Sequence, residues 1–275
     1  MKQYYRCIEN DMLCILVDEY ILEQCEEKIN LILNSFKFSP SYMLDGYSVH
    51  SFFIIQEKDK KKYSTQNKYA INNLENDKWI LELINDLDVF VTEVLKCTVL
   101  HGSCIKLNEK NVLLLGERWS GKTTLAYYLS TECDGEYVSD DCVYIVNKHY
   151  YGLCTPLPIR NYEHINAKYG KNILTSVMDS DNVLRTLLLP PKVLGAVPNI
   201  DVVLLPQYIS NGERKIIKRS PSEAFKAIIK NVHSFKDMRS MYLDIIALSN
   251  NAQIYSMTYS NSQSAYNMLM NHVFG

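Results

Sequence analysis

The chain has 275 residues, of which 47% are hydrophobic and 22% are charged, and its net charge at pH 7 is −2. This composition is typical of a folded protein of one large domain or two small ones, and it excludes a disordered chain. The near-neutral charge argues against a nucleic-acid partner or an anionic membrane surface. No signal-peptide pattern and no apolar run of membrane length occur, so we expect a cytoplasmic protein. The eight cysteines include no C-x-x-C pair, which favours free, buried thiols over disulfides or a zinc site.

Residues 1–96 are expected to form a smaller α/β domain. Apolar runs predict its strands, and apolar residues at helical spacing predict its helices. The charged run at 58–62 is interpreted as an exposed hairpin tip. The expected elements are strands ending at residue 17, over 49–55 and over 68–73, and helices over 19–34 and 75–97. The domain contains no catalytic constellation, so substrate recognition is its expected role.

A glycine-bounded loop follows the apolar run from Val112 to Leu115. The sequence from Gly116 to Thr123 has the form G-x-x-x-x-G-K-S/T, which is the phosphate-binding P-loop motif. A strand is predicted before it and a helix after it, an arrangement that points backbone N–H groups at a polyphosphate. We therefore expect ATP or another nucleoside triphosphate to bind here. The candidate nucleotide-binding residues are Gly116, Glu117, Arg118, Trp119, Ser120, Gly121, Lys122, Thr123 and Thr124.

The strand before the loop is expected to have an antiparallel neighbour. Residues 98–107 form another apolar run, and the polar turn from Asn108 to Asn111 joins the two runs as a hairpin. In the common nucleotide-binding folds, the P-loop strand belongs to a parallel sheet reached by crossovers. We therefore predict an α/β fold, α+β-like in character, with a mixed, largely antiparallel sheet at the core of a second domain over 97–275.

Weaker patterns complete this second domain. A capping box from Ser220 to Glu223, with proline at the first helical position, predicts a helix to about Val232. No element is predicted between 233 and 253. The other expected elements are strands over 142–146, 151–154, 187–191, 200–205 and 254–259 and a helix over 262–273.

Two adjacent aspartates, Asp140 and Asp141, follow the P-loop helix and precede an apolar strand. A kinase needs one carboxylate near its metal ion and a second to orient or deprotonate the acceptor hydroxyl. Lys122 is expected to reach the β- and γ-phosphates. Thr123, Asp140 and Asp141 are the candidate Mg²⁺ ligands. The sequence leaves open which aspartate binds the metal and which acts as the base.

Two further residues are candidates for catalysis. His101 lies on the strand expected to pair with the P-loop strand, from where its ring could hydrogen-bond an aspartate of the pair. Arg160 ends a proline-bounded extended segment and could stabilise phosphoryl charge or bind an acidic substrate. For both residues a purely structural role is the alternative.

The motifs His101-Gly102, Gly116 to Thr123 and Val138-Ser139-Asp140-Asp141 together resemble the core of the HPr kinase/phosphorylase family. Relatives of phosphoenolpyruvate carboxykinase have a similar arrangement. The segment from Pro156 to Arg160 resembles shorter HPr kinase-like proteins, including those that phosphorylate serine in ribosomally made peptides such as lasso precursors. The resemblance covers residues 98–160.

The resemblance implies an ATP- and Mg²⁺-dependent kinase acting on a hydroxyl of a peptide or small protein, with a serine as the expected acceptor. It implies that the loop and Lys122 hold the triphosphate, Thr123 and one aspartate hold Mg²⁺, and the other aspartate is the base beside His101. The chain departs from the family at Trp119, where a glycine is usual, and it lacks the longer C-terminal signature used for dephosphorylation. A nucleotide-binding scaffold without phosphoryl transfer and a small-molecule kinase remain the alternatives, and a homo-oligomer is left open.

Overall fold

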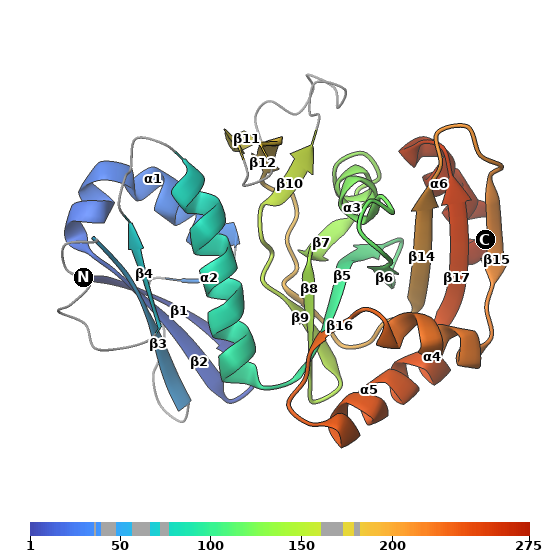
Figure 1. Cartoon of the computed structure of the whole chain (residues 1–275), viewed down its shortest axis with the longest axis horizontal. Helices are drawn as coiled ribbons and strands as arrows, with labels where there is room; N and C mark the ends of the chain where they lie inside the picture. Colours follow the sequence, from blue (N-terminus) through green and yellow to red (C-terminus); the bar gives the residue numbers. More distant parts are fainter. Residues whose placement is uncertain (36, 40–47, 57–66, 72–76, 161–172, 179–181) are drawn as a thin grey trace. The chain divides into compact units, whose positions relative to one another are not determined.

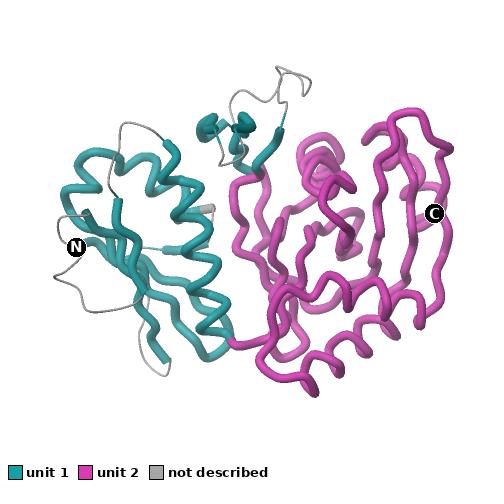
Figure 2. The backbone as a smooth tube through the Cα atoms, in the orientation of Figure 1, with its two compact units in different colours: residues 1–95, 158–189 teal, residues 96–157, 190–275 magenta. Residues whose placement is uncertain are grey.

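The computed structural model describes residues 1–35, 37–39, 48–56, 67–71, 77–160, 173–178 and 182–275. The chain divides into two compact units (Figure 2). Unit 1 comprises Met1–Leu95 and Pro158–Leu189, and unit 2 comprises Lys96–Leu157 and Pro190–Gly275. This division matches the expected boundary near residue 96 but places 158–189 with the N-terminal unit instead of with the second. Separate roles for the two domains stay a prediction.

Unit 1 begins with a four-stranded sheet of order β1-β2-β3-β4 and two helices (Figure 1). Its apolar runs form these elements because their side chains, such as Ile15, Ile54 and Leu83, are fully buried. Where one N-terminal strand was expected, β1 and β2 form an antiparallel hairpin. The elements are β1 (Lys2–Ile8), β2 (Asp11–Val17), α1 (Glu19–Ser35), β3 (Ser48–Gln56), β4 (Lys68–Ile71) and α2 (Lys78–Leu95).

The hairpin expected between residues 49–55 and 68–73 is wrong. β3 and β4 pair in parallel, with Phe53 opposite Lys68, whereas the two strands of a hairpin are antiparallel. The expected tip at 58–62 lies outside the described residues. Unit 1 also holds a small sheet of order β10-β12-β11. Its strands are β10 (Leu157–Arg160), β11 (Ile173–Met178) and β12 (Leu184–Leu188).

Unit 2 is organised around a ten-stranded sheet of order β13-β9-β8-β5-β6-β14-β17-β15, with β7 and β16 also paired to β5. Among the described strands of this sheet, β14 pairs in parallel with β6 and β17, and the other pairs are antiparallel. The predicted mixed, largely antiparallel α/β fold is therefore confirmed. The strands are β5 (Thr98–Leu107), β6 (Lys110–Leu115), β7 (Glu136–Ser139), β8 (Cys142–Val146), β9 (His149–Gly152), β13 (Ala196–Val197), β14 (Val202–Tyr208), β15 (Lys215–Lys218), β16 (Val232–Ser234) and β17 (Gln253–Tyr259).

Helices cover both faces of this sheet, which explains why its central strands are apolar without interruption. Along β6, Val112 and Leu114 enter one hydrophobic core and Leu113 and Leu115 enter another, because successive side chains point to opposite faces. The first core includes side chains of α3 (Lys122–Thr131) and α6 (Ser262–Leu269), and the second includes those of α4 (Pro221–Ile229) and α5 (Met238–Asn251). The P-loop strand is thereby fixed at the centre of the unit.

The helices of unit 2 differ in how clearly the sequence predicts them. The capping box of α4 is present, since the Ser220 side chain accepts from Glu223 N–H and the Glu223 side chain accepts from Ser220 N–H. α5 was not predicted, because it exposes Met238, Leu243 and Ile246 and its apolar face is poorly defined. The expected C-terminal helix continues from α6 into a π-helical segment, Met270–Phe274.

All eight cysteines are free, as the sequence predicts. None of the helices in the described parts of the chain combines the length and the apolar character needed to cross a membrane.

Candidate active site

The loop from Gly116 to Gly121 joins the end of β6 to the start of α3, as predicted. Gly121 is the N-cap of α3 and has a left-handed backbone with φ of 91°, and no side chain caps this helix end. A Cβ atom at Gly121 would lie 2.1 Å from the Tyr259 Oη, so only glycine fits there. The first-turn N–H groups of α3 therefore have no side-chain acceptor and can bind an anion.

Two strand ends hold the second half of this loop. Tyr208 N–H at the end of β14 donates to the Ser120 carbonyl oxygen at 3.1 Å. The Tyr259 hydroxyl at the end of β17 donates to the Gly121 carbonyl oxygen at 3.2 Å. Because both strands run parallel to β6, their carboxyl ends lie at the same edge of the sheet as the loop. The cradle is thus fixed before any ligand binds.

Lys122, the first residue of α3, is buried, and its ammonium group lies inside the loop. Its Nζ donates to the carbonyl oxygens of Gly116 at 2.7 Å and Glu117 at 3.1 Å. Burial lowers the Lys122 pKa, and the charges of Asp140 and Asp141 oppose this shift. Thr123, half-buried, and Thr124, exposed, follow it in the first turn. The cation predicted to meet the phosphates is therefore positioned by the loop backbone.

The two aspartates occupy different environments. Asp140 is buried, and its Oδ1 accepts from the Ser103 hydroxyl of β5, while its Oδ2 has no hydrogen-bond partner among the described residues. Asp141 is exposed and has a left-handed backbone with φ of 65°. Burial, with the Asp141 charge, raises the Asp140 pKa to about 7, although the Ser103 and Thr123 hydroxyls and Lys122 counter the rise. A buried carboxylate oxygen without a partner beside the Thr123 hydroxyl fits a divalent cation.

His101 lies beside this pair, but it contacts the backbone and not a carboxylate. Its Nδ1 is 3.1 Å from the Asp141 carbonyl oxygen, and Gly102 N–H donates to the same oxygen at 3.1 Å. The expected hydrogen bond to an aspartate side chain is therefore corrected to one with the main chain. Burial and the nearby Lys122 charge lower the His101 pKa, against the opposing pull of Asp141. Because a carbonyl oxygen only accepts, the neutral ring carries its proton on Nδ1.

Trp119 occupies a strained position in the loop. Its φ is 70°, in the left-handed region that glycine adopts freely, and its side chain is 73% exposed. A bulky residue at this position requires either a negative φ or tolerated strain, and the positive φ shows that the strain is tolerated. Strain of this kind is often retained where a site needs a particular side chain.

Replacing Trp119 by glycine or by alanine separates this strain from the indole. Both variants lose the side chain, but only glycine relieves the left-handed backbone. We expect the glycine variant to unfold in urea with a free energy about 1 kcal/mol higher than the alanine variant. Equal stabilities would mean that φ at this position is not positive in solution.

Asn231, which follows α4, is a site residue that the sequence analysis missed. Its Oδ1 accepts from Gly116 N–H at 3.2 Å, its Nδ2 donates to the Ala227 carbonyl oxygen at 2.8 Å, and its own carbonyl accepts from His101 N–H at 2.7 Å. A single polar residue at the end of a helix forms no sequence pattern from which this role could be predicted. It links the start of the loop to His101.

An Asn231→Ala variant should weaken nucleotide binding by about tenfold, because Gly116 N–H loses its acceptor and the loop start is released. An Asn231→Asp variant keeps an acceptor at this position and should retain most of the affinity. Titration of each variant with a fluorescent ATP analogue in the presence of Mg²⁺ measures the difference. Equal affinities for alanine and wild type would show that the loop does not need this clamp.

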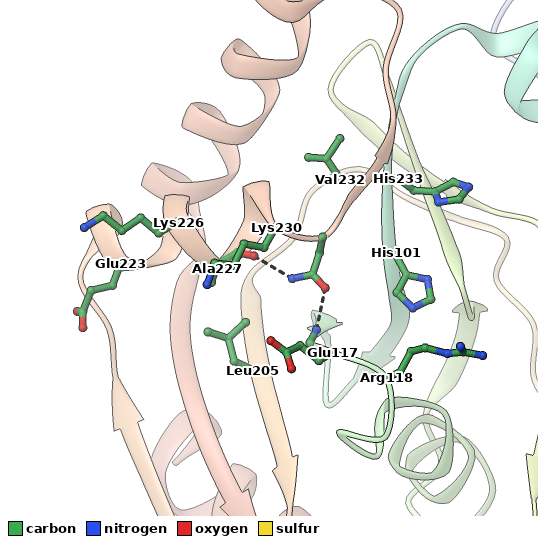
Figure 3. A pocket seen from close by; sticks show the side chains of 12 residues that line it. His101, Glu117, Arg118, Leu205, Glu223, Lys226, Ala227, Lys230, Val232 and His233 are labelled. Atoms are coloured by element: carbon green, nitrogen blue, oxygen red, sulfur yellow. Dashed lines mark hydrogen bonds between the residues drawn. The ribbon is translucent and has the colours of Figure 1, made fainter.

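A cavity of about 520 Å³ borders the first half of the loop and lies wholly within unit 2. Figure 3 shows Glu117 near its centre, His101, Arg118 and His233 on one side, and α4 on the other. The exposed Glu117 and Arg118 side chains thus face a cavity rather than the cradle formed by Gly121 and Lys122. Arg160, the last residue of β10, belongs to unit 1, and its catalytic role stays a prediction.

Comparison with known proteins adds little to this geometry. No protein-family model matches the chain. No curated protein matches it either. Among solved structures, the chain is similar to the HPr(Ser) kinase/phosphatase from Coxiella burnetii, at 10% sequence identity and a TM-score of 0.30, covering 64% of this chain and 90% of that one. At this identity and score, the function has to be inferred from the site itself.

Proposed function

We propose that the protein is an ATP- and Mg²⁺-dependent kinase that phosphorylates a serine hydroxyl of a peptide or small protein. One observation carries this proposal: an uncapped helix N-terminus with a loop-held lysine lies next to a buried aspartate and an exposed one. A nucleotide-binding site alone needs the loop and a metal-associated carboxylate. The second, exposed carboxylate is the group that a phosphoryl acceptor requires.

Different residues of the site are assigned to the phosphates of the nucleotide and to its metal ion. The first-turn N–H groups of α3 and Lys122 would hold the phosphates, and Thr123 with Asp140 would hold Mg²⁺. The unsatisfied Asp140 Oδ2 supports this choice, because a metal ion would compensate its buried charge. When bound, Mg²⁺-ATP supplies the phosphoryl group to be transferred. The charges of Asp140 and Asp141 oppose the lowering of the Lys122 pKa by burial and so favour the charged ammonium group.

Asp141 is assigned as the base toward the acceptor hydroxyl. Its carboxylate is exposed, so an incoming hydroxyl can reach it, whereas that of Asp140 is enclosed. His101 would act as a positioning residue, because its Nδ1–H and the Gly102 N–H both hold the Asp141 main-chain carbonyl. Most of the rate would come from orientation and from neutralisation of phosphoryl charge. Substrate recognition by unit 1 is part of the same proposal.

An intact-mass screen tests the function directly. Candidate serine-containing peptides are incubated with the full chain and Mg²⁺-ATP, and a gain of one phosphoryl group per peptide is the expected result. An Asp141→Asn chain serves as the control for contaminating kinases. Tight Mg²⁺-ATP binding without transfer to any peptide or small hydroxylated molecule would favour the nucleotide-binding scaffold instead.

A further inference from the structure

The cavity beside the loop has an uncompensated positive charge. Arg118 lines it from the loop, and Lys226 and Lys230 line it from α4, where they lie one turn apart on the same helix face. In the described part of the chain, no carboxylate oxygen forms an ion pair with any of these three side chains. The chain as a whole has a net charge of −2, so this concentration of cations is local.

The acidic residues of the cavity do not cancel this charge. Glu223 is already engaged, because its carboxylate pairs with Arg219 at 3.2 Å and accepts from Ser220 N–H at 3.0 Å. Glu117 is the one other carboxylate in the cavity wall. His101 and His233 also line the cavity, and neither carries a carboxylate that would cancel this charge. An anionic group in the cavity would therefore find cations that lack a partner.

The lining also argues against a nucleoside base as the occupant. The apolar part of the wall consists of Leu205, Ala227 and Val232, and among the described residues no Phe, Tyr or Trp lines it to stack on a base. At the same time the cavity includes His101, whose Nδ1 holds the Asp141 main-chain carbonyl, and the loop start. A ligand in the cavity would therefore contact the residue that holds the main chain of Asp141, the proposed base.

We propose that this cavity holds a carboxylate side chain of an acidic acceptor peptide, bound by Lys226 and Lys230 close to the serine that is phosphorylated. The proposal rests on the proposed kinase function and adds the substrate class to it. Charge-assisted hydrogen bonds from lysine side chains to a carboxylate are stronger than those between neutral groups. The exposure of both lysines lets an extended peptide reach them from solution.

A set of short synthetic peptides tests this preference. Each peptide contains one serine and carries aspartate, alanine or lysine at a neighbouring position, and phosphoryl incorporation with Mg²⁺-ATP is measured by mass. The wild-type chain should prefer aspartate over lysine peptides by about tenfold or more. A Lys226→Glu/Lys230→Glu chain should lose or reverse this preference while its affinity for a fluorescent ATP analogue stays within about twofold.

The matched control is a Lys110→Glu/Lys148→Glu chain, which reverses two exposed lysines outside the cavity, one at the start of β6 and one in the turn before β9, and should keep the aspartate preference. Lysines near the end of α4 also interact favourably with the helix dipole, so the readout is specificity and not activity alone. If charge reversal weakens ATP binding and leaves the peptide preference unchanged, the cavity serves the nucleotide and the proposal is wrong.

Direct binding keeps this inference separate from the kinase assignment. The fluorescence anisotropy of a labelled aspartate-rich peptide should rise with the wild-type chain and much less with the Lys226→Glu/Lys230→Glu chain, whether or not transfer occurs. Binding without transfer would reject the kinase function and keep the anionic-peptide site. Transfer to peptides without regard to their charge would keep the kinase and reject the site.

Discussion

An Asp141→Asn chain is expected to bind Mg²⁺-ATP with unchanged affinity but to transfer phosphoryl groups about 10³-fold more slowly than wild type. The amide has nearly the same shape as the carboxylate but cannot take the proton of the acceptor hydroxyl. Asparagine also tolerates a left-handed backbone, so the φ of 65° at this position should not destabilise the variant. Single-turnover transfer to a peptide found in the mass screen measures the rate.

A Lys122→Ala chain should fail at an earlier step. It removes the ammonium group from the loop, so both nucleotide affinity and transfer are expected to fall, the rate by about 10²-fold or more.

The control for Asp141 is Asp134→Asn, an exposed aspartate with φ of 60° before β7, which should behave as wild type. Transfer that persists in the Asp141→Asn chain would show that Asp141 is not the base.

The sequence predicted the parts of unit 2 that local patterns determine. Residues 98–115 form the expected hairpin because two apolar runs flank a short polar turn, and their pairing places Gly102 opposite Leu115 at the start of the loop. The glycines of the loop motif indicate a backbone conformation that other residues rarely adopt, and Gly121 has such a left-handed conformation. The sequence could not predict that one aspartate is buried and the other exposed. Two adjacent aspartates form the same sequence pattern whichever side chain points into the protein.

Features that depend on distant contacts could not be predicted. Asn231 reaches the loop only because α4 packs on the same sheet, and hydrophobic alternation does not determine whether β3 and β4 pair in parallel or antiparallel. The segment 158–189 was expected in a second domain over 97–275, yet it groups with unit 1. The sequence could thus identify the phosphate-binding loop and its candidate acids, but not the residues that hold them in place.

The buried Asp140 should make the stability of the metal-free protein fall as pH rises. Burial raises its pKa to about 7 in the folded protein from the ordinary value of 3.8, so between these values the folded state binds more protons than the unfolded state. The stabilisation is therefore fully present below pH 4 and is lost as pH rises through 7. Between pH 5 and pH 8 the loss should be on the order of 3 kcal/mol in the free energy of unfolding.

An Asp140→Asn chain cannot ionise at this position, so its stability should not show this loss. The measurement is urea unfolding of both chains at pH 5 and pH 8 with a chelator present, and the pH-dependent difference between them cancels the contributions of the other titrating groups. Mg²⁺ should then stabilise the wild type at pH 8 and leave the Asp140→Asn chain unchanged, since the metal compensates a buried charge that only the wild type has. Parallel pH profiles for the two chains, or equal stabilisation by Mg²⁺, would move the metal site from Asp140 to Asp141 and reverse the roles proposed for the pair.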